Sequence, residues 1–323
     1  MKNRLIKTLN IKRFKLVLLL EGLLVGILAG LVIVGYRICL TNGALWLQRI
    51  LAYCKQSIFT IIIWFVILFV IALVVTKLLD WESLISGSGI PQLEGELAGK
   101  IDAKWWRVLI AKFFGGFLAN FSGLALGREG PSIQLGAMVG KGIGKVLKRG
   151  KTEERYLLTC GASAGLAAAF HAPLAGVMFA LEEVHKHFSA PLLISVMTSS
   201  IAADYLMSSI LGMAPVFSFN IHGTLPTQYY WMVIILGIIL GLLGAFYNKA
   251  LLFVQSLYNH SKHLNNYTKL LIPFILAGIL GFTVPQLLGS GDTLVDLLIE
   301  GKLTMSLILL LLAGKFLFAI TCF

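Results

Sequence analysis

Long apolar segments joined by short polar stretches make up most of this 323-residue chain. The apolar segments lie near 16–37, 58–76, 106–126, 131–147, 156–182, 190–212, 229–257, 269–288 and 303–323. Residues 58–76 and 229–248 contain no charged side chain, and each stretch is about long enough to cross the hydrocarbon layer of a bilayer as one helix. The pattern predicts an all-α polytopic membrane protein.

The composition excludes an ordinary soluble domain, because 58% of the residues are hydrophobic and only 13% are charged. The net charge of +12 does not indicate nucleic-acid binding, since the basic residues gather at the ends of the apolar segments. Six of them precede the first segment: Lys2, Arg4, Lys7, Lys12, Arg13 and Lys15. By the positive-inside rule, we expect residues 1–15 to be a cytoplasmic N-terminal segment of a multi-pass protein of the cell membrane.

A weak internal repeat organises the chain. The first copy contains, in order, Gly26, Gly30, Tyr36, Gly87-Ser88-Gly89 and Lys112. The same landmarks recur at nearly the same spacing as Gly237, Gly241, Tyr247, Gly289-Ser290-Gly291 and Lys315. We therefore expect a first repeat over about 16–212 and a second over about 229–323.

The two repeats are expected to have opposite orientations in the membrane. The first is entered from a basic segment, whereas residues 212–230 contain no Lys or Arg and should be external. Inverted repeats with interrupted helices are a transporter architecture, in which the binding site lies where the repeats meet. The second copy ends at Phe323, before the counterpart of a further polar break, so we expect 16–323 to be an incomplete transport domain.

Two polar breaks interrupt the apolar pattern of the first repeat. They read Gly87-Ser88-Gly89-Ile90-Pro91 and Gly127-Arg128-Glu129-Gly130-Pro131. A proline near the start of a helix and glycines before it are typical of half-helices, whose unpaired N–H groups and positive dipole attract anions. We expect an anion site formed by Ser88, Gly89, Ile90, Arg128, Glu129 and Gly130. Ser88 could instead act only as a helix cap.

Carboxylates next to these breaks suggest proton chemistry. Glu129, at the start of the second half-helix, could occupy the anion position and leave it when protonated, or it could form a permanent pair with Arg128. Glu182 and Glu183 end a long uncharged run, which is usually only a boundary with water. Glu183 and His187 would share a helix face, but the segment lacks a recognised zinc motif, and we expect no metal site.

Other polar or small residues in the apolar segments have less specific interpretations. Lys112 and Lys315 could raise the local potential for anions, or they could neutralise a carboxylate or a helix C-terminus. His171 is expected to be a hydrogen-bonded packing residue. The glycines at 136, 140 and 144 and at 26 and 30 are expected to allow close helix approach. The four cysteines show no metal or redox spacing and are expected to be packing residues.

The two breaks and the segment Gly161–Gly176, which continues to Glu182 and Glu183, resemble the CLC family of chloride channels and proton-coupled chloride exchangers. The resemblance implies an inverted-repeat helical fold, a homodimer and one anion pathway per subunit. It implies that Ser88 coordinates the anion, that Glu129 is the gating and external proton glutamate, and that Glu183 is the internal proton-transfer glutamate. The family's second-half Gly-Gly-x-Phe-x-Pro motif and its later pore tyrosine are absent.

These observations predict a proton-coupled chloride antiporter, with chloride and protons as transported ligands and no cofactor, rather than an enzyme. Three alternatives remain at this point. The chain could be a passive chloride channel, a non-transporting remnant or assembly partner of an intact relative, or a metal-dependent intramembrane enzyme at Glu182–His187.

Overall fold

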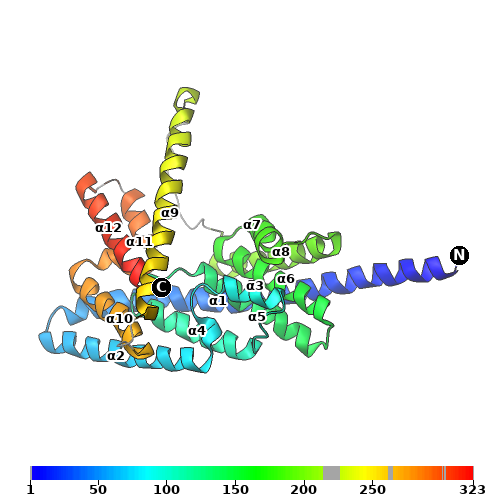
Figure 1. Cartoon of the computed structure of the whole chain (residues 1–323), viewed down its shortest axis with the longest axis horizontal. Coiled ribbons are helices and arrows are strands. Elements are labelled where there is room, and N and C mark those ends of the chain that lie inside the picture. The colour runs from blue at the N-terminus through cyan, green and yellow to red at the C-terminus, as the bar shows by residue number, and fades with distance from the viewer. Residues whose placement is uncertain (1, 214–225, 261–264, 300, 302, 323) are drawn as a thin grey trace. The chain divides into compact units, whose positions relative to one another are not determined.

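A computed structural model describes residues 2–213, 226–260, 265–299, 301 and 303–322. For residues 2–14 and 259 it describes the backbone alone. The described residues are almost entirely helical and contain no strand. The α-helices are α1 (Lys2–Cys54), α2 (Ile58–Trp81), α3 (Ile90–Leu97), α4 (Trp105–Phe121), α5 (Glu129–Val146), α6 (Lys151–Phe170), α7 (Pro173–Phe179), α8 (Ala190–Leu211), α9 (Tyr230–His260), α10 (Asn266–Thr283), α11 (Asp292–Ile299) and α12 (Met305–Cys322) (Figure 1). Short helical turns are η1 (Ser83–Ile85), η2 (Ala180–His185), η3 (Thr227–Tyr229) and η4 (Pro285–Leu287).

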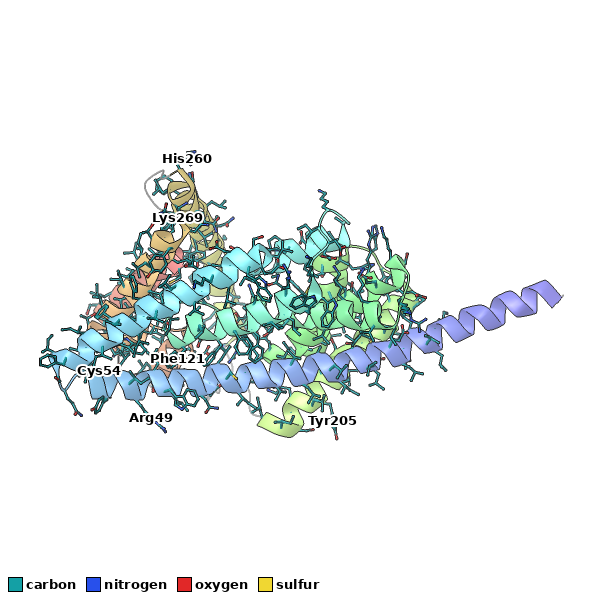
Figure 2. All side chains as sticks on the ribbon, turned by 90° about the horizontal axis from the view of Figure 1, so that it is seen from below. Arg49, Cys54, Phe121, Tyr205, His260 and Lys269 are labelled. Carbon is teal, nitrogen blue, oxygen red and sulfur yellow. The ribbon has the colours of Figure 1, made fainter. Side chains whose placement is uncertain are left out.

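Within the described residues, six helices are long and apolar enough to cross a membrane: α1 from Lys15, α2, α8, α9 with the turn before it, α10 and α12. The long α1 runs without interruption to Cys54, well beyond the predicted segment 16–37 (Figure 2). The apolar segment 156–182 is not one continuous helix, because it divides after Phe170 into α6, α7 and the π-helical turn η2. His171 ends α6 in the left-handed conformation, with φ of 54°, and Pro173 then starts α7.

The chain divides into two compact units whose boundaries do not follow the repeat. The first unit comprises Met1–Gly43, Lys77–Leu118 and Gly127–Pro215, and the second comprises Ala44–Thr76, Ala119–Leu126 and Val216–Phe323. Both predicted polar breaks of the first repeat fall within the first unit. The break at Gly289–Gly291 falls within the second.

Glycine and serine allow the helices of the first unit to pack with their backbones in contact. A Cβ on Gly140 of α5 would clash with the Leu157 carbonyl oxygen of α6, and Gly136 and Gly161 face each other in the same way. On α1, a Cβ on Gly26 would strike Ser199 of α8. The predicted packing role of the Gly136–Gly144 stripe and of Gly26 and Gly30 is therefore confirmed. Small residues permit this closeness where lipid offers no hydrophobic force to join helices.

One buried ion cluster ties α5 to the loop that follows α3. The Lys141 side chain is completely buried, and its Nζ donates to the Glu96 carboxylate, to Asp102 Oδ1 at 2.7 Å and to the Ala103 carbonyl oxygen at 2.7 Å. Glu96 is also buried and accepts the backbone N–H of Ala103 at 2.7 Å. The cluster fixes the direction in which the chain leaves α3, and therefore the half-helix itself.

We expect Lys141→Met to destabilise the protein by about 3–5 kcal/mol, because Glu96 would then be a buried charge without its partner. The matched control is Lys145→Met on the same helix. Lys145 pairs with Glu154 at 3.2 Å, but its side chain is 49% exposed, so its loss should cost less than about 1 kcal/mol. Thermal unfolding in detergent measures both variants. Equal stability of the two would show that Lys141 does not hold this region together.

Candidate functional site

The two polar breaks of the first repeat meet. A Cβ on Gly130, at the start of α5, would lie 2.5 Å from the backbone oxygen and 3.0 Å from the Cα of Ser88. The absence of a side chain at Gly130 therefore brings the N-terminal turn of α5 against the residue that precedes α3. The two half-helices present their starts, and hence their unpaired N–H groups, to one region of the first unit.

Ser88 makes the contact expected of a helix cap. Its Oγ accepts the backbone N–H of Ile90 at 3.3 Å, so it caps the first turn of α3. In the described part of the chain its own hydroxyl hydrogen has no acceptor, which leaves this hydrogen to donate to a bound anion. Gly87 and Gly89 on either side have φ of 65° and 89°, the left-handed region that favours glycine. Capping and anion coordination are compatible here because they use different atoms of one hydroxyl group.

Gln134 of α5 supports this turn, a role that the sequence did not reveal. Its Nε2 donates to the Leu84 carbonyl oxygen at 2.8 Å, and its side chain lies against Gly89, where a Cβ would collide with it. Gln134 is buried, and its Oε1 has no hydrogen-bond partner among the described residues. The side chain thus links α5 to the chain before α3 and fixes the spacing of the two breaks.

Lys112 is buried and bonds to backbone carbonyl oxygens at the first break. Its Nζ donates to the carbonyl oxygens of Ile85 and Gly87 at 2.8 and 2.7 Å. Of the two sequence interpretations, neutralisation of a helix C-terminus is the one that these contacts favour. The ammonium group compensates the negative end of the interrupted chain, so the positive start of α3 is left for an anion.

The second repeat contains the same arrangement in the second unit. Lys315 Nζ donates to the carbonyl oxygens of Leu287 and Gly289 at 2.9 and 2.5 Å. Gly289 and Gly291 have φ of 68° and 106°, close to the values at Gly87 and Gly89. The chemistry after the turn differs, because Ser290 Oγ donates to Asp292 Oδ2 at 3.0 Å instead of capping a backbone amide.

Glu129 is half-buried at the first position of α5, and its carboxylate lies over Gly127. A Cβ on Gly127 would collide with this carboxylate, so the glycine provides the space that the side chain occupies. Tyr36 of α1 lies close enough for an electrostatic interaction with Glu129. A carboxylate next to two helix starts is in a position to compete with an anion for the same N–H groups.

Glu182 and Glu183 are both exposed on the π-helical turn η2 of the first unit. The predicted common helix face of Glu183 and His187 is wrong, because η2 ends at His185 and Lys186 turns the chain with φ of 58°. Among the described residues, no group of three His, Cys, Asp or Glu side chains is placed to hold a metal ion.

His171 lies in a polar cluster between three helices. Its Nε2 is 2.9 Å from a guanidinium nitrogen of Arg37, and its Nδ1 is 3.3 Å from Ser208 Oγ and 3.4 Å from Asp204 Oδ1. The prediction of a hydrogen-bonded histidine is confirmed. The Asp and Arg partners were not predicted, because they lie 33 and 134 residues away in the sequence.

Comparison with known proteins identifies this architecture. The family model described as voltage gated chloride channel matches residues 69–323, which is most of the chain. The chain belongs to this family. The H⁺/Cl⁻ exchange transporter ClcA of Citrobacter koseri is 32% identical over 324 aligned residues, which cover 95% of this chain and 67% of the relative.

Further relatives agree with the family and the fold. The H⁺/Cl⁻ exchange transporter ClcA of Vibrio parahaemolyticus is 37% identical over 245 residues, 74% of this chain and 52% of the relative. The chain thus spans about half the length of this curated relative. A slow cyanobacterial Cl⁻/H⁺ antiporter has a TM-score of 0.89 and 30% identity, covering 94% of this chain and 73% of that structure. A CLC-type fluoride/proton antiporter, with 22% identity and a TM-score of 0.74, shares the fold. The protein is therefore a multi-pass, all-α membrane protein of the voltage gated chloride channel family.

We expect Gly130→Ala to weaken chloride binding about ten-fold or more, because the new Cβ forces the Ser88 turn away and costs a hydrogen bond to the anion. Gly35→Ala on α1 is the matched control, since a Cβ there meets nothing within 4 Å. Calorimetric titration with chloride in gluconate buffer measures both. Wild-type affinity in Gly130→Ala would show that contact between the two turns does not form the anion site.

Proposed function

We propose that the chain provides the anion- and proton-handling half of a proton-coupled chloride antiporter, in which chloride and protons cross the membrane in opposite directions. The observation that carries this proposal is the contact of Gly130 with Ser88, with the Glu129 carboxylate beside it. It gives one location at which an anion and a carboxylate would compete for the same N–H groups. The named antiporter relatives support chloride and proton as the exchanged pair.

In the proposed mechanism, the start of α3, the Ser88 hydroxyl and the N-terminal turn of α5 hold the anion. Partial charges of this kind bind an anion without a full cationic partner and allow its release. Gly89, Ile90, Arg128 and Gly130 contribute as the residues that shape these two turns. Glu129 replaces the anion when it is ionised and leaves the position when it is protonated.

Glu183 is proposed as the proton-transfer group at the other end of the route. Its exposed position on η2 supports this role. We further propose that the N-terminus is cytoplasmic, as the basic residues before Leu16 favour, and that the functional form is a homodimer with no resident cofactor.

We expect two single substitutions to separate proton movement from anion movement in proteoliposomes of the purified protein. Glu129→Gln removes the group that competes with chloride, so chloride flux should no longer drive protons. Glu183→Gln removes the carboxylate that is proposed to transfer protons, so proton flux should stop while chloride flux continues. Asp80→Asn, an exposed carboxylate at the end of α2, is the control and should keep coupled exchange.

The reversal potential under opposed chloride and pH gradients identifies the mode of transport. A value that depends on both gradients supports exchange, and a value set by chloride alone indicates a passive channel. Unchanged proton flux in both glutamate variants, or no flux from the wild-type protein, would refute the proposed function.

A further inference from the structure

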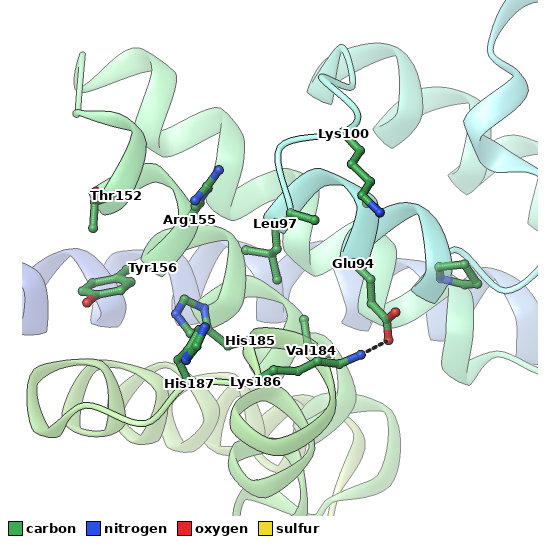
Figure 3. A pocket seen from close by; sticks show the side chains of 13 residues that line it. Glu94, Leu97, Lys100, Thr152, Arg155, Tyr156, Val184, His185, Lys186 and His187 are labelled. Atoms are coloured by element: carbon green, nitrogen blue, oxygen red, sulfur yellow. Dashed lines mark ion pairs between the residues drawn. The ribbon is translucent and has the colours of Figure 1, made fainter.

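A pocket of about 860 Å³ opens in the first unit, and Pro91 of the first polar break is part of its lining (Figure 3). Its charged and imidazole lining consists of Glu94, Lys100, Arg155, His185, Lys186 and His187. These residues come from α3 and the turn after it, from the first turns of α6, and from the end of η2 and the two residues that follow it. The size falls in the range of about 300–1,000 Å³ that is typical of small-ligand sites.

The pocket is strongly basic. Lys100, Arg155 and Lys186 carry permanent positive charge, whereas Glu94 is the single carboxylate in the lining. Lys186 Nζ pairs with this carboxylate at 3.5 Å (Figure 3). Within the described part of the chain, neither Arg155 nor Lys100 has an acidic partner. These three basic residues are exposed, and their excess of positive charge lines a cavity large enough for a ligand.

The local structure positions Arg155 and His185. A Cβ on Gly99, which has φ of 74°, would lie 2.9 Å from Nη2 of Arg155, so the turn after α3 makes room for the guanidinium group. Thr159 Oγ1 donates to the Arg155 carbonyl oxygen at 2.8 Å and lies 2.9 Å from Nδ1 of His185. Because the hydroxyl hydrogen is used in the first bond, Thr159 accepts Nδ1–H of His185. Nε2 is then the nitrogen left to bind a ligand.

His185 makes the charge of the pocket depend on pH. Burial, followed by the neighbouring His187 and Arg155, lowers the pKa of His185 below its usual value. Tyr156 lies beside it with ring centroids 5.5 Å apart, and Glu94, Lys100 and Lys186 complete the charged surroundings. The imidazole is therefore mostly neutral near pH 7. It becomes charged, and its Nε2 becomes a donor, only in more acidic solution.

We infer that this basic pocket is a binding site for a phosphate-type oxyanion, held by Arg155, Lys100 and the His185 imidazole, and distinct from the proposed chloride position at Ser88 and Glu129, neither of which lines it. Guanidinium and imidazolium groups bind oxyanions through charge-assisted hydrogen bonds, and a guanidinium group can donate two parallel bonds. Binding of the anion favours the charged imidazole, so affinity rises as the pH falls through the pKa of His185. The inference does not depend on the proposed exchange of chloride and protons.

Sulfate is the probe that tests the pocket, because its charge is constant between pH 5.5 and 7.5. Calorimetric titration of the purified protein in chloride-free buffer should show sulfate binding about five-fold or more tighter at pH 5.5 than at pH 7.5. His185→Gln should abolish this pH dependence and keep binding at the level seen at pH 7.5. Arg155→Ala should weaken binding about ten-fold or more at both pH values.

The matched control is Lys104→Ala, an exposed lysine four residues after Lys100 that does not line the pocket, which should bind sulfate like the wild type. Equal losses in Lys104→Ala and Arg155→Ala would mean that only general surface charge is involved, and would overturn the inference. Unchanged elution of each variant in size-exclusion chromatography verifies folding, and Arg155→Lys provides a second, milder variant.

A second arm distinguishes a free anion from a lipid headgroup. Mass spectrometry would measure phosphatidylglycerol that remains bound to the protein in nanodiscs of mixed phosphatidylglycerol and phosphatidylcholine. Loss of bound phosphatidylglycerol in Arg155→Ala, but not in Lys104→Ala, identifies a lipid headgroup as the natural source. Sulfate binding without this lipid preference identifies a soluble oxyanion. The absence of both sulfate binding and lipid preference in the wild-type protein refutes the site.

Discussion

A helix that stops inside a membrane protein leaves backbone N–H and C=O groups that water cannot satisfy, and the rest of this structure depends on how they are paired. At the first break, Lys112 donates hydrogen bonds to the carbonyl oxygens of Ile85 and Gly87. The Ser88 hydroxyl oxygen accepts the backbone N–H of Ile90. The carbonyl side is thereby neutralised by a full positive charge. The amide side is capped by a neutral group that still has a hydrogen to donate, and the proposed anion site rests on this asymmetry.

The second break has the same backbone arrangement but a different side chain at its helix start. Lys315 and the two glycines reproduce the geometry of the first break. Here, however, Asp292 places a carboxylate at the first position of α11 and accepts the hydroxyl of Ser290. A negative side chain at a helix start satisfies the dipole from within the chain. In both repeats a lysine therefore bonds to the carbonyl oxygens at the break. The serine hydroxyl accepts a backbone N–H in the first repeat and donates to a carboxylate in the second.

Local residue patterns were sufficient to predict the membrane class, both polar breaks, the recurring lysines and the glycine packing faces. Each of these signals is a short motif or a fixed spacing. Contacts between distant segments were not predictable in this way: Gln134 bonds to Leu84 across 50 residues, and Lys141 bonds to Glu96 across 45. A polar residue in an apolar helix shows that a partner exists but not which one. Whether the apolar run around His171 forms one helix or two was not predicted; in the structure His171 ends α6 in the left-handed conformation and lies beside Arg37 and Asp204.

The glycines on the two sides of Glu129 have opposite effects, which bears on how the proposed gate would move. Gly130 lies against Ser88 and fixes the backbone at the start of α5, whereas Gly127 leaves open the volume that the Glu129 carboxylate occupies. Gln134 and Lys112 add further restraint to the backbone of both turns. Glu183 lies on a different element, the turn η2, where it is exposed. The conformational change that exchange requires can therefore be concentrated in one side chain, because the helix starts that attract the anion are held in place by contacts that do not involve Glu129.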